Sequence, residues 1–332
     1  MTRPWFAFEL TQSCTRNCLF CYNFWKADGS PAREALGTAQ AISLLEKLAG
    51  EADPSGLTLT GGEPLLREDL EDLSAAASRL FPALCLSTTA DGLTPDRARR
   101  LIRAGLIDYE VALSAARQET LSSLCGASPP IGKTVEAVSL LSGAGARVTA
   151  SIVLCTANAP ELREIILLAA ASGARAACLN PFAPSGAGSA HPGLRLTPKA
   201  LASSARTAAA ASGDTGLPVY FGMSVRRCTV PADVLEVCRS GPCVCCSGKW
   251  AIGPAGFLRP CEQSPLELGN LFEHGFRDLA ESAGAAAFRR LPRGCEGCGM
   301  ISGCGGGCRA GGEPESPGSQ FPDTGSATQS TE

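Results

Sequence analysis

Strand-like and helix-like segments alternate over the first half of the chain, and this alternation constrains the fold more than any other feature. Several of the strand-like runs are almost continuously apolar, as expected for parallel strands that are covered by helices. Such repeats predict an α/β fold built on a parallel sheet or an open barrel. The six predicted strands are Trp5–Leu10, Leu57–Thr60, Ala83–Thr88, Asp108–Leu113, Arg147–Leu154 and Ala176–Asn180.

Helix start and stop signals lie between these strands. Thr38 is placed to begin a helix that runs to about Leu48, ahead of a glycine. The Thr94-Pro95 and Ala159-Pro160 pairs each open a further helix, and another is predicted over Thr197–Ala211. In barrels of this kind the chemistry takes place at the carboxyl ends of the strands. Residues that directly follow a strand are therefore the first to consider for function.

Composition and charge exclude several classes of protein. The 332 residues are 45% hydrophobic and 18% charged, which permits a sizeable core, and the net charge is −3 without a long basic run. Nucleic-acid binding therefore gains no electrostatic support. No N-terminal signal pattern is present, and no apolar run reaches the roughly 18 residues that a membrane span needs. We expect a cytoplasmic protein that binds neither membrane nor nucleic acid.

The chain has 17 cysteines, which is unusual for a large protein outside a secretory context. In such a protein, clustered cysteines indicate metal binding more than disulfides. Three lie within residues 14–21 and ten within residues 228–308. The four between these groups lie in apolar or helical surroundings and are predicted to be small buried residues of the core. These four are Cys85, Cys125, Cys155 and Cys178.

Cys14, Cys18 and Cys21 form a C-x3-C-x2-C motif directly after the first predicted strand. Four thiolates usually hold a four-iron cluster, so three would leave one iron open to a small molecule. The alternative is a zinc site completed by a distant ligand. The scarcity of histidine, which occurs only at His191 and His274, disfavours zinc.

A glycine-rich turn, Gly61-Gly62-Glu63-Pro64, follows the second predicted strand. Glycines in this position allow the backbone to approach a ligand closely, and Glu63 could meet a cationic group. Alone, the sequence is also compatible with an ordinary tight turn. Its position on the same sheet edge as the cysteine motif favours a shared site.

Together, the cysteine motif with Phe20 before its last cysteine and the Gly-Gly-Glu-Pro turn resemble the radical SAM superfamily. The resemblance extends from residue 5 to about residue 190. It implies a partial (β/α)6 barrel with a [4Fe–4S] cluster on the three cysteines and S-adenosylmethionine on the fourth iron. An electron delivered to this cluster would cleave S-adenosylmethionine to a 5′-deoxyadenosyl radical.

The resemblance also implies which residues contact S-adenosylmethionine. The glycine-rich turn corresponds to the family's methionine-binding segment, and three serines correspond to polar strand ends. The implied contacts are Gly61, Gly62, Glu63, Ser87, Ser114 and Ser151. The segment A-L-S-A-A-R around Ser114 departs from the Asp-Gly that often follows this serine in relatives. Strand-end capping is the alternative role for the serines.

The C-terminal cysteines resemble the SPASM domain, an extension of radical SAM enzymes that carries auxiliary iron–sulfur clusters. Cys246, Gly256 and Cys261 are followed by a C-x2-C-x5-C-x3-C group that begins at Cys295 and ends at Cys308. Zinc ribbons also use paired C-x2-C motifs, but not this order after a radical SAM core. The resemblance implies a small, loop-rich domain with one or two auxiliary [4Fe–4S] clusters.

Ligands for the auxiliary clusters follow from the same resemblance. The first cluster would use Cys246, Cys261, Cys308 and one upstream thiol. In relatives this upstream ligand commonly lies six positions before the equivalent of Cys246, and Ser240 occupies that position here. Cys238, Cys243 or Cys245 must therefore substitute, and Cys243 is favoured. One member of the Cys245-Cys246 pair is expected not to bind metal.

The second cluster would use Cys295, Cys298 and Cys304, but the cysteine that usually completes it downstream is missing. The second site therefore has an open iron, a ligand other than cysteine, or no cluster.

Four regions are predicted along the chain. They are a radical SAM core over residues 1–195, a bridging region over 196–237, a SPASM domain over 238–311 and a disordered tail over 312–332. Because the core begins at Trp5, recognition of a leader peptide would need a separate partner protein. A reductant such as flavodoxin or ferredoxin is also expected.

The SPASM resemblance implies a maturase that modifies a side chain of a ribosomally made peptide or a protein. Modification of a tetrapyrrole or another small molecule is the alternative, and a non-enzymatic iron–sulfur scaffold is disfavoured because it needs no open iron. The sequence assigns no catalytic acid or base. Glu262, Asp108 and Tyr109 are possible proton-transfer groups, whereas Lys249 and Trp250 are expected to pack rather than bind substrate.

Overall fold

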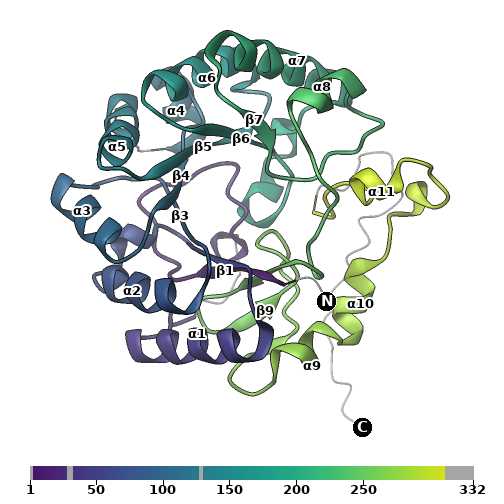
Figure 1. Ribbon diagram of the computed structural model, residues 1–332. Helices are drawn as coiled ribbons and strands as arrows, with labels where there is room; N and C mark the ends of the chain where they lie inside the picture. Colours follow the sequence, from purple (N-terminus) through teal and green to yellow (C-terminus); the bar gives the residue numbers. More distant parts are fainter. Residues whose placement is uncertain (1–2, 28–32, 127–129, 311–332) are drawn as a thin grey trace.

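A single curved sheet of ten strands forms the centre of the molecule (Figure 1). The computed structural model describes residues 3–27, 33–126 and 130–310, so the predicted tail lies outside the described residues. The strands follow the order β10-β9-β8-β1-β2-β3-β4-β5-β6-β7, and those from β8 through β1 to β7 pair in parallel. The sheet confirms the predicted parallel α/β architecture.

All six predicted strands are confirmed, with ends that differ by no more than one residue from the prediction. Two further parallel strands, β7 and β8, were missed because three and four residues are too few to show a periodic pattern. The strands are β1 (Trp5–Glu9), β2 (Gly56–Thr60), β3 (Leu84–Thr88), β4 (Asp108–Ala112), β5 (Arg147–Leu154), β6 (Ala176–Pro181), β7 (Val219–Phe221), β8 (Lys249–Ile252), β9 (Phe257–Arg259) and β10 (Gly269–Asn270).

Helix caps follow the sequence signals closely. Thr94 accepts a hydrogen bond from the Arg97 amide and Thr197 from the Ala200 amide, each at 3.2 Å. Thr38 instead donates to Asp69 at 2.6 Å, one residue after the N-cap of its helix. The helices are α1 (Thr38–Ala52), α2 (Leu70–Leu80), α3 (Pro95–Arg103), α4 (Gln118–Cys125), α5 (Ile131–Gly143), α6 (Leu162–Ala171), α7 (Pro198–Thr215), α8 (Ala232–Val237), α9 (Phe276–Ala280), α10 (Ala283–Arg289) and α11 (Ile301–Cys304).

The two faces of the sheet differ in burial. Helices α1 to α7 surround the outer face (Figure 1), and outward side chains such as Leu84 and Leu86 join their apolar residues in one core. The intervening residues Cys85 and Ser87 point to the inner face and are only half-buried. The same alternation occurs in β4 and β5. The inner face is therefore accessible to a ligand, whereas the outer face is committed to packing.

The C-terminal part of the chain continues this sheet. Strand β8 pairs with β1, with Lys249 opposite Trp5, and β9 and β10 follow as antiparallel strands. Phe276 of α9 covers the outer face there, with its ring centroid 5.1 Å from Phe6 and 5.5 Å from Trp250. Trp250 thus packs as expected. The predicted regional boundaries stay predictions, because the sheet is continuous across them.

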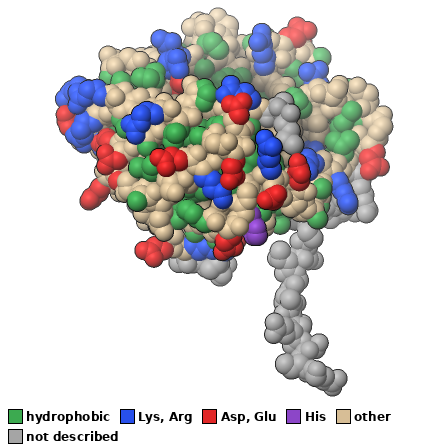
Figure 2. Space-filling view, turned by 60° about the horizontal axis from the view of Figure 1, so that its bottom comes forward, with side chains coloured by type: hydrophobic (Ala, Val, Ile, Leu, Met, Phe, Trp, Pro, Cys, Tyr) green, Lys and Arg blue, Asp and Glu red, His purple; other side chains and the backbone are tan. Residues whose placement is uncertain are grey.

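Charged side chains of both signs are interspersed over the face that includes the lower edge of Figure 1 (Figure 2). Within the described ranges, no helix combines the length and the apolar character that crossing a membrane requires.

A fully buried ion pair joins the first strand to the C-terminal part. The Arg259 guanidinium contacts the Glu9 carboxylate, and neither side chain has any exposed surface. Arg259 also donates to the carbonyl of Ser264 at 2.9 Å, and its guanidinium lies 4.7 Å from the ring centroid of Phe24. Burial raises the pKa of the Glu9 carboxyl to about 7, and Arg259 opposes that rise.

Replacing Arg259 should show how much this ion pair contributes to the free energy of unfolding. At pH 8, Arg259→Met leaves a buried carboxylate without a counter-ion and should lower the free energy of unfolding by about 3–5 kcal/mol. Loss of the guanidinium raises the pKa of Glu9 further, so the deficit should shrink as the pH falls and the carboxyl takes up a proton. The double variant, in which Glu9→Gln is combined with Arg259→Met, should recover most of the lost free energy of unfolding. Denaturant unfolding of the three proteins at several pH values measures this, and a pH-independent deficit would contradict it.

Candidate active site at the carboxyl ends of the strands

The three cysteines of the first motif share the loop that follows β1. Each is half-buried, and Cys21 lies close enough to Cys14 and Cys18 to interact electrostatically with both. Burial raises the pKa of the Cys21 thiol. Among the described residues, no three cysteine, histidine or acidic side chains converge on a point that a single metal ion could occupy. The loop nevertheless gathers three thiols at the carboxyl end of the first strand, as predicted.

Buried polar contacts hold this cysteine loop in place. Arg16, between the first two cysteines, forms an ion pair with Asp91 at 2.5 Å, and both side chains are less than one-tenth exposed. Lys26 donates to the Arg16 carbonyl at 2.7 Å. The Asn17 amide donates to the carbonyl of Cys125 at the end of α4, at 3.2 Å. The loop is thereby fixed to elements that follow β3 and β4.

The glycine-rich turn after β2 packs directly against the cysteine loop. The Gly62 amide donates to the Thr11 carbonyl and the Glu63 amide to the Ser13 carbonyl, both at 2.8 Å. A Cβ atom on Gly62 would lie 2.0 Å from the Ser13 carbonyl oxygen, and one on Gly61 would lie 2.7 Å from that of Thr11. The glycines therefore allow a close backbone approach, as expected, but the backbone that they approach is that of the cysteine loop and not that of a ligand.

Glu63 is fully buried and saturated with donors from the protein itself. Its carboxylate accepts from the Thr88 hydroxyl at 2.6 Å, from the amide and hydroxyl of Thr89 at 2.7 and 2.6 Å, and from the Leu65 amide at 3.0 Å. These bonds join the turn after β2 to the end of β3. The carboxylate thus positions the turn, and contact between Glu63 and S-adenosylmethionine stays a prediction.

The three predicted serines occupy different environments. Ser87 and Ser151 are half-buried on the inner face, and Ser151 accepts a hydrogen bond from the Asn180 amide group at 3.2 Å. Ser114 is almost fully buried, and its hydroxyl accepts from the Val153 amide at 3.3 Å. This bond favours strand-end capping for Ser114, whereas Ser87 and Ser151 remain accessible to a ligand.

One of the four isolated cysteines contacts the cysteine loop. Cys125 is buried in an apolar cluster, as predicted, and its thiol is in hydrogen-bond contact with that of Cys18. No spacing rule connects positions 18 and 125, so the sequence carried no signal for this contact. Cys155, in the same apolar cluster, and Cys178 are also buried as predicted. The prediction is wrong for Cys85, which is half-buried because its position in β3 points to the inner face.

Charged residues on the inner face form a second polar group. Lys249 forms an ion pair with Glu262 at 2.7 Å, and Glu110 lies close enough to interact with both. Burial raises the pKa of the Glu110 carboxyl, and Lys249 only partly offsets this. Burial also opposes ionisation of Glu262, but the Lys249 ammonium outweighs it and lowers the pKa of Glu262. Lys249 therefore faces the site, contrary to the expectation that it packs.

The other proposed proton-transfer groups lie elsewhere. Asp108 forms an ion pair with Arg147 at 2.5 Å, at the amino ends of β4 and β5, and the arginine is largely exposed. Tyr109 is buried in the outer core. Of the three residues considered from the sequence, only Glu262 reaches the inner face.

The C-terminal cysteines include a second group of thiols. Cys245 is in hydrogen-bond contact with both Cys243 and Cys261. Cys246 is fully buried in a left-handed backbone conformation with φ of 62°, and its sulfur lies 3.5 Å from the Ala285 carbonyl. Cys245 thus contacts both of these thiols, and Cys246 lies close enough to Cys243 and Cys261 to interact with them electrostatically. The choice of Cys246 as a cluster ligand stays a prediction.

Two cavities lie near the last parallel strands. One, of about 450 Å³, opens beside residues that follow β6 and β7 and reaches Cys308. It shares the carboxyl-end side of the sheet with the cysteine loop. Its lining includes Phe182, Leu196, Leu201 and Met223.

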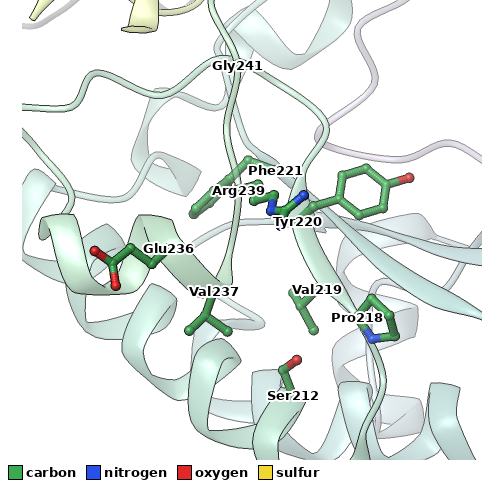
Figure 3. A pocket seen from close by; sticks show the side chains of 9 residues that line it. All are labelled: Ser212, Pro218, Val219, Tyr220, Phe221, Glu236, Val237, Arg239 and Gly241. Atoms are coloured by element: carbon green, nitrogen blue, oxygen red, sulfur yellow. The ribbon is translucent and has the colours of Figure 1, made fainter.

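The other cavity, of about 570 Å³, lies between α7, α8 and β7. Figure 3 shows Ser212 and Val219 facing it, with Glu236 and Arg239 along one side. Its lining extends along the whole of β7, from Pro218 before the strand to Phe221 at its end.

Comparison with known proteins identifies the family. Residues 8–169 match the model of the radical SAM superfamily. The chain carries a radical SAM domain over these residues. It is 28% identical over 280 residues to the PqqA peptide cyclase of Methylocella silvestris, covering 82% of this chain and 72% of the cyclase. The mycofactocin maturase MftC of Mycolicibacterium smegmatis is 26% identical over 326 residues, covering 91% of this chain and 77% of MftC.

Two further similarities extend this result. The AdoMet-dependent heme synthase of Methanosarcina barkeri is 25% identical over 304 residues, covering 86% of this chain and 83% of the synthase. Streptococcus suis SuiB bound to its precursor peptide SuiA superposes with a TM-score of 0.74 at 15% identity, covering 93% of this chain and 72% of SuiB. The SuiB match shows the same fold. The superfamily implies a [4Fe–4S] cluster and S-adenosylmethionine, and this chain is a radical SAM enzyme.

Substitution of Gly62 should displace the cysteine loop without unfolding the barrel. In Gly62→Ala the new methyl group would collide with the Ser13 backbone, which cannot move without shifting Cys14. We expect reconstituted protein to lose most of the iron of this cluster, about four atoms per chain. Gly50→Ala is the matched control, because its Cβ meets nothing within 4 Å. Iron analysis beside circular dichroism measures the effect, and full iron loading of Gly62→Ala would refute the packing role.

Proposed function

We propose that this radical SAM enzyme modifies a side chain of a peptide or protein, as a maturase of ribosomally made peptides. The observation that carries the proposal is the cavity of about 450 Å³ on the carboxyl-end side of the sheet. It lies on the side of the cysteine loop and reaches Cys308, which is predicted to bind an auxiliary cluster. Its mixture of apolar side chains and backbone suits a peptide segment.

The similar proteins support a peptide substrate. The PqqA peptide cyclase and the maturase MftC match most of this chain, and SuiB, which has the same fold, was crystallised with a precursor peptide. The heme synthase supports the alternative, a tetrapyrrole or other small-molecule substrate. More of the relatives named above act on peptides, so we take the peptide as the substrate class.

The chemistry of the donor set fits the implied cofactors. Cys14, Cys18 and Cys21 would hold the [4Fe–4S] cluster, and Gly61 and Gly62, with Ser87 and Ser151, would lie beside S-adenosylmethionine. When bound, these cofactors supply a 5′-deoxyadenosyl radical that abstracts a hydrogen atom from the substrate. The protein's own part is to fix the cysteine loop through the turn after β2 and to place substrate against the inner face. Glu110 and the Lys249–Glu262 pair can then exchange protons with it.

The C-terminal thiols would hold one or two auxiliary [4Fe–4S] clusters in a SPASM arrangement. For the first we assign Cys243, Cys245, Cys261 and Cys308, and for the second Cys295, Cys298 and Cys304. These clusters would accept an electron from the substrate. A cytoplasmic location, a flavodoxin or ferredoxin as reductant and a separate leader-binding protein complete the proposal.

Release of 5′-deoxyadenosine tests the first step. Reconstituted enzyme with dithionite and S-adenosylmethionine should form it, and Cys18→Ala should abolish its formation. Cys238→Ala is the control, because that thiol is buried beside the Ala205 carbonyl and should be dispensable. Cleavage by Cys18→Ala would show that the site is wrongly assigned.

The substrate class needs a separate test. Peptides encoded by small open reading frames beside the gene, incubated with the enzyme, should change mass only when S-adenosylmethionine is present. A mass change in a tetrapyrrole with none in any peptide would instead establish the alternative.

The adjacent pair Cys245 and Cys246 allows a sharp test of the first auxiliary site. Cys245→Ser should lower the iron content by about four atoms per chain and remove one auxiliary cluster signal from the EPR spectrum. Cys246→Ser, one residue away, should retain the iron, because its thiol contacts the Ala285 carbonyl. The reverse result would restore the assignment that the sequence alone suggested.

A further inference from the structure

The second auxiliary group has three thiols on one short segment and lacks a fourth from the usual position. Cys295, Cys298 and Cys304 lie within ten residues, and the chain has no cysteine after Cys308. The group is partly ordered by its own backbone, since the Cys298 amide donates to the Cys295 carbonyl at 3.3 Å. Cys304 is buried, and the other two are half-buried. A thiol from another part of the chain would complete the usual four-thiolate set.

A segment after β7 lies directly against this cysteine group. The Ser224 hydroxyl donates to the Cys304 carbonyl at 2.8 Å, and the Cys308 amide donates to the Ser224 carbonyl at 3.0 Å. Arg226 donates to the Gly306 carbonyl at 3.1 Å. Three hydrogen bonds thus connect two segments that are about eighty residues apart in sequence.

This segment ends in a tight turn that carries an exposed cysteine. The amide and hydroxyl of Thr229 both donate to the Arg226 carbonyl, at 2.9 and 2.7 Å, so Arg227 and Cys228 form the corner. Arg227 lies against Gly303, because a Cβ atom built on Gly303 would be 2.4 Å from the Nε atom of Arg227. Gly303 immediately precedes Cys304. Cys228 therefore directly follows a residue that lies against the neighbour of Cys304.

We propose that Cys228 supplies the fourth thiolate of the second auxiliary cluster. The proposal rests on the presence of that cluster in the proposed function. Among the described residues Cys228 is the one exposed cysteine, and no hydrogen bond holds its thiol elsewhere in them. A thiol on an exposed turn can turn toward an assembling cluster and lose its proton on binding iron without disturbing the core. The turn thus replaces the downstream cysteine that the chain lacks.

Alkylation provides a readout that is independent of activity. N-ethylmaleimide should label Cys228 rapidly in chelator-treated protein and at least tenfold more slowly after anaerobic cluster reconstitution. Ser203→Cys places a control thiol at an exposed position of α7, and its labelling rate should not depend on reconstitution. Equal labelling of Cys228 in both states would overturn the proposal.

EPR spectroscopy and iron analysis separate this proposal from the existence of the cluster. A background with Cys14, Cys18 and Cys21 replaced by alanine leaves the auxiliary clusters alone. There, Cys228→Ser should shift or abolish the same signal that Cys295→Ser abolishes. If Cys295→Ser removes iron and Cys228→Ser leaves both iron and spectrum unchanged, the Cys228 assignment is wrong. If neither changes them, the second cluster itself is absent and that part of the proposed function fails.

Discussion

The hydrogen-bonded junction between the cysteine loop and the turn after β2 determines the position of the whole site. Gly62 and Glu63 donate to the backbone of the loop, and the Glu63 carboxylate holds the end of β3. One junction therefore fixes three successive strand ends relative to one another. Because both glycines lie where a Cβ would collide with backbone, few sequences could make this contact. The three thiols before Tyr22 owe their placement to it.

The continuous sheet extends this rigidity to the C-terminal part of the chain. Strand β8 pairs with β1, so Lys249 belongs to the same inner face as Ser87 and Glu110. The fully buried pair of Glu9 and Arg259 reinforces this connection within the core. Removing either charge alone would leave the other buried without a partner and lower the stability of the fold. The pair therefore joins the first strand to the C-terminal part of the chain more specifically than apolar packing would. The thiols that flank β8 and β9, among them Cys245 and Cys261, therefore keep a fixed relation to the cysteine loop.

The sequence predicted those features that depend on local pattern. The strands, the caps at Thr94 and Thr197, and the cysteine motif after β1 all arise from residues that are neighbours in the chain. The contact between Cys18 and Cys125 and the saturation of Glu63 depend on side chains that come together only on folding. No periodicity or spacing could have predicted these contacts.

The same limit applies to the choice between Cys245 and Cys246 as a ligand of the proposed first auxiliary cluster. Adjacent residues satisfy a spacing motif almost equally, and the direction of each side chain depends on backbone conformation. The left-handed conformation of Cys246, the 3.5 Å contact of its sulfur with the Ala285 carbonyl and the contacts of Cys245 with Cys243 and Cys261 exist only in the folded chain.

Charge balance on the inner face bears on the kind of chemistry the site can support. Arg259 offsets Glu9 and Lys249 offsets Glu262, whereas Glu110 forms no ion pair within the described residues. Burial raises the pKa of Glu110, so its carboxyl takes up a proton more readily than an exposed glutamate does. A substrate that loses a hydrogen atom and then an electron must also release a proton. A carboxyl of raised pKa that is not held in an ion pair of its own, beside an ion pair that can stabilise the change in charge, is suited to receive that proton.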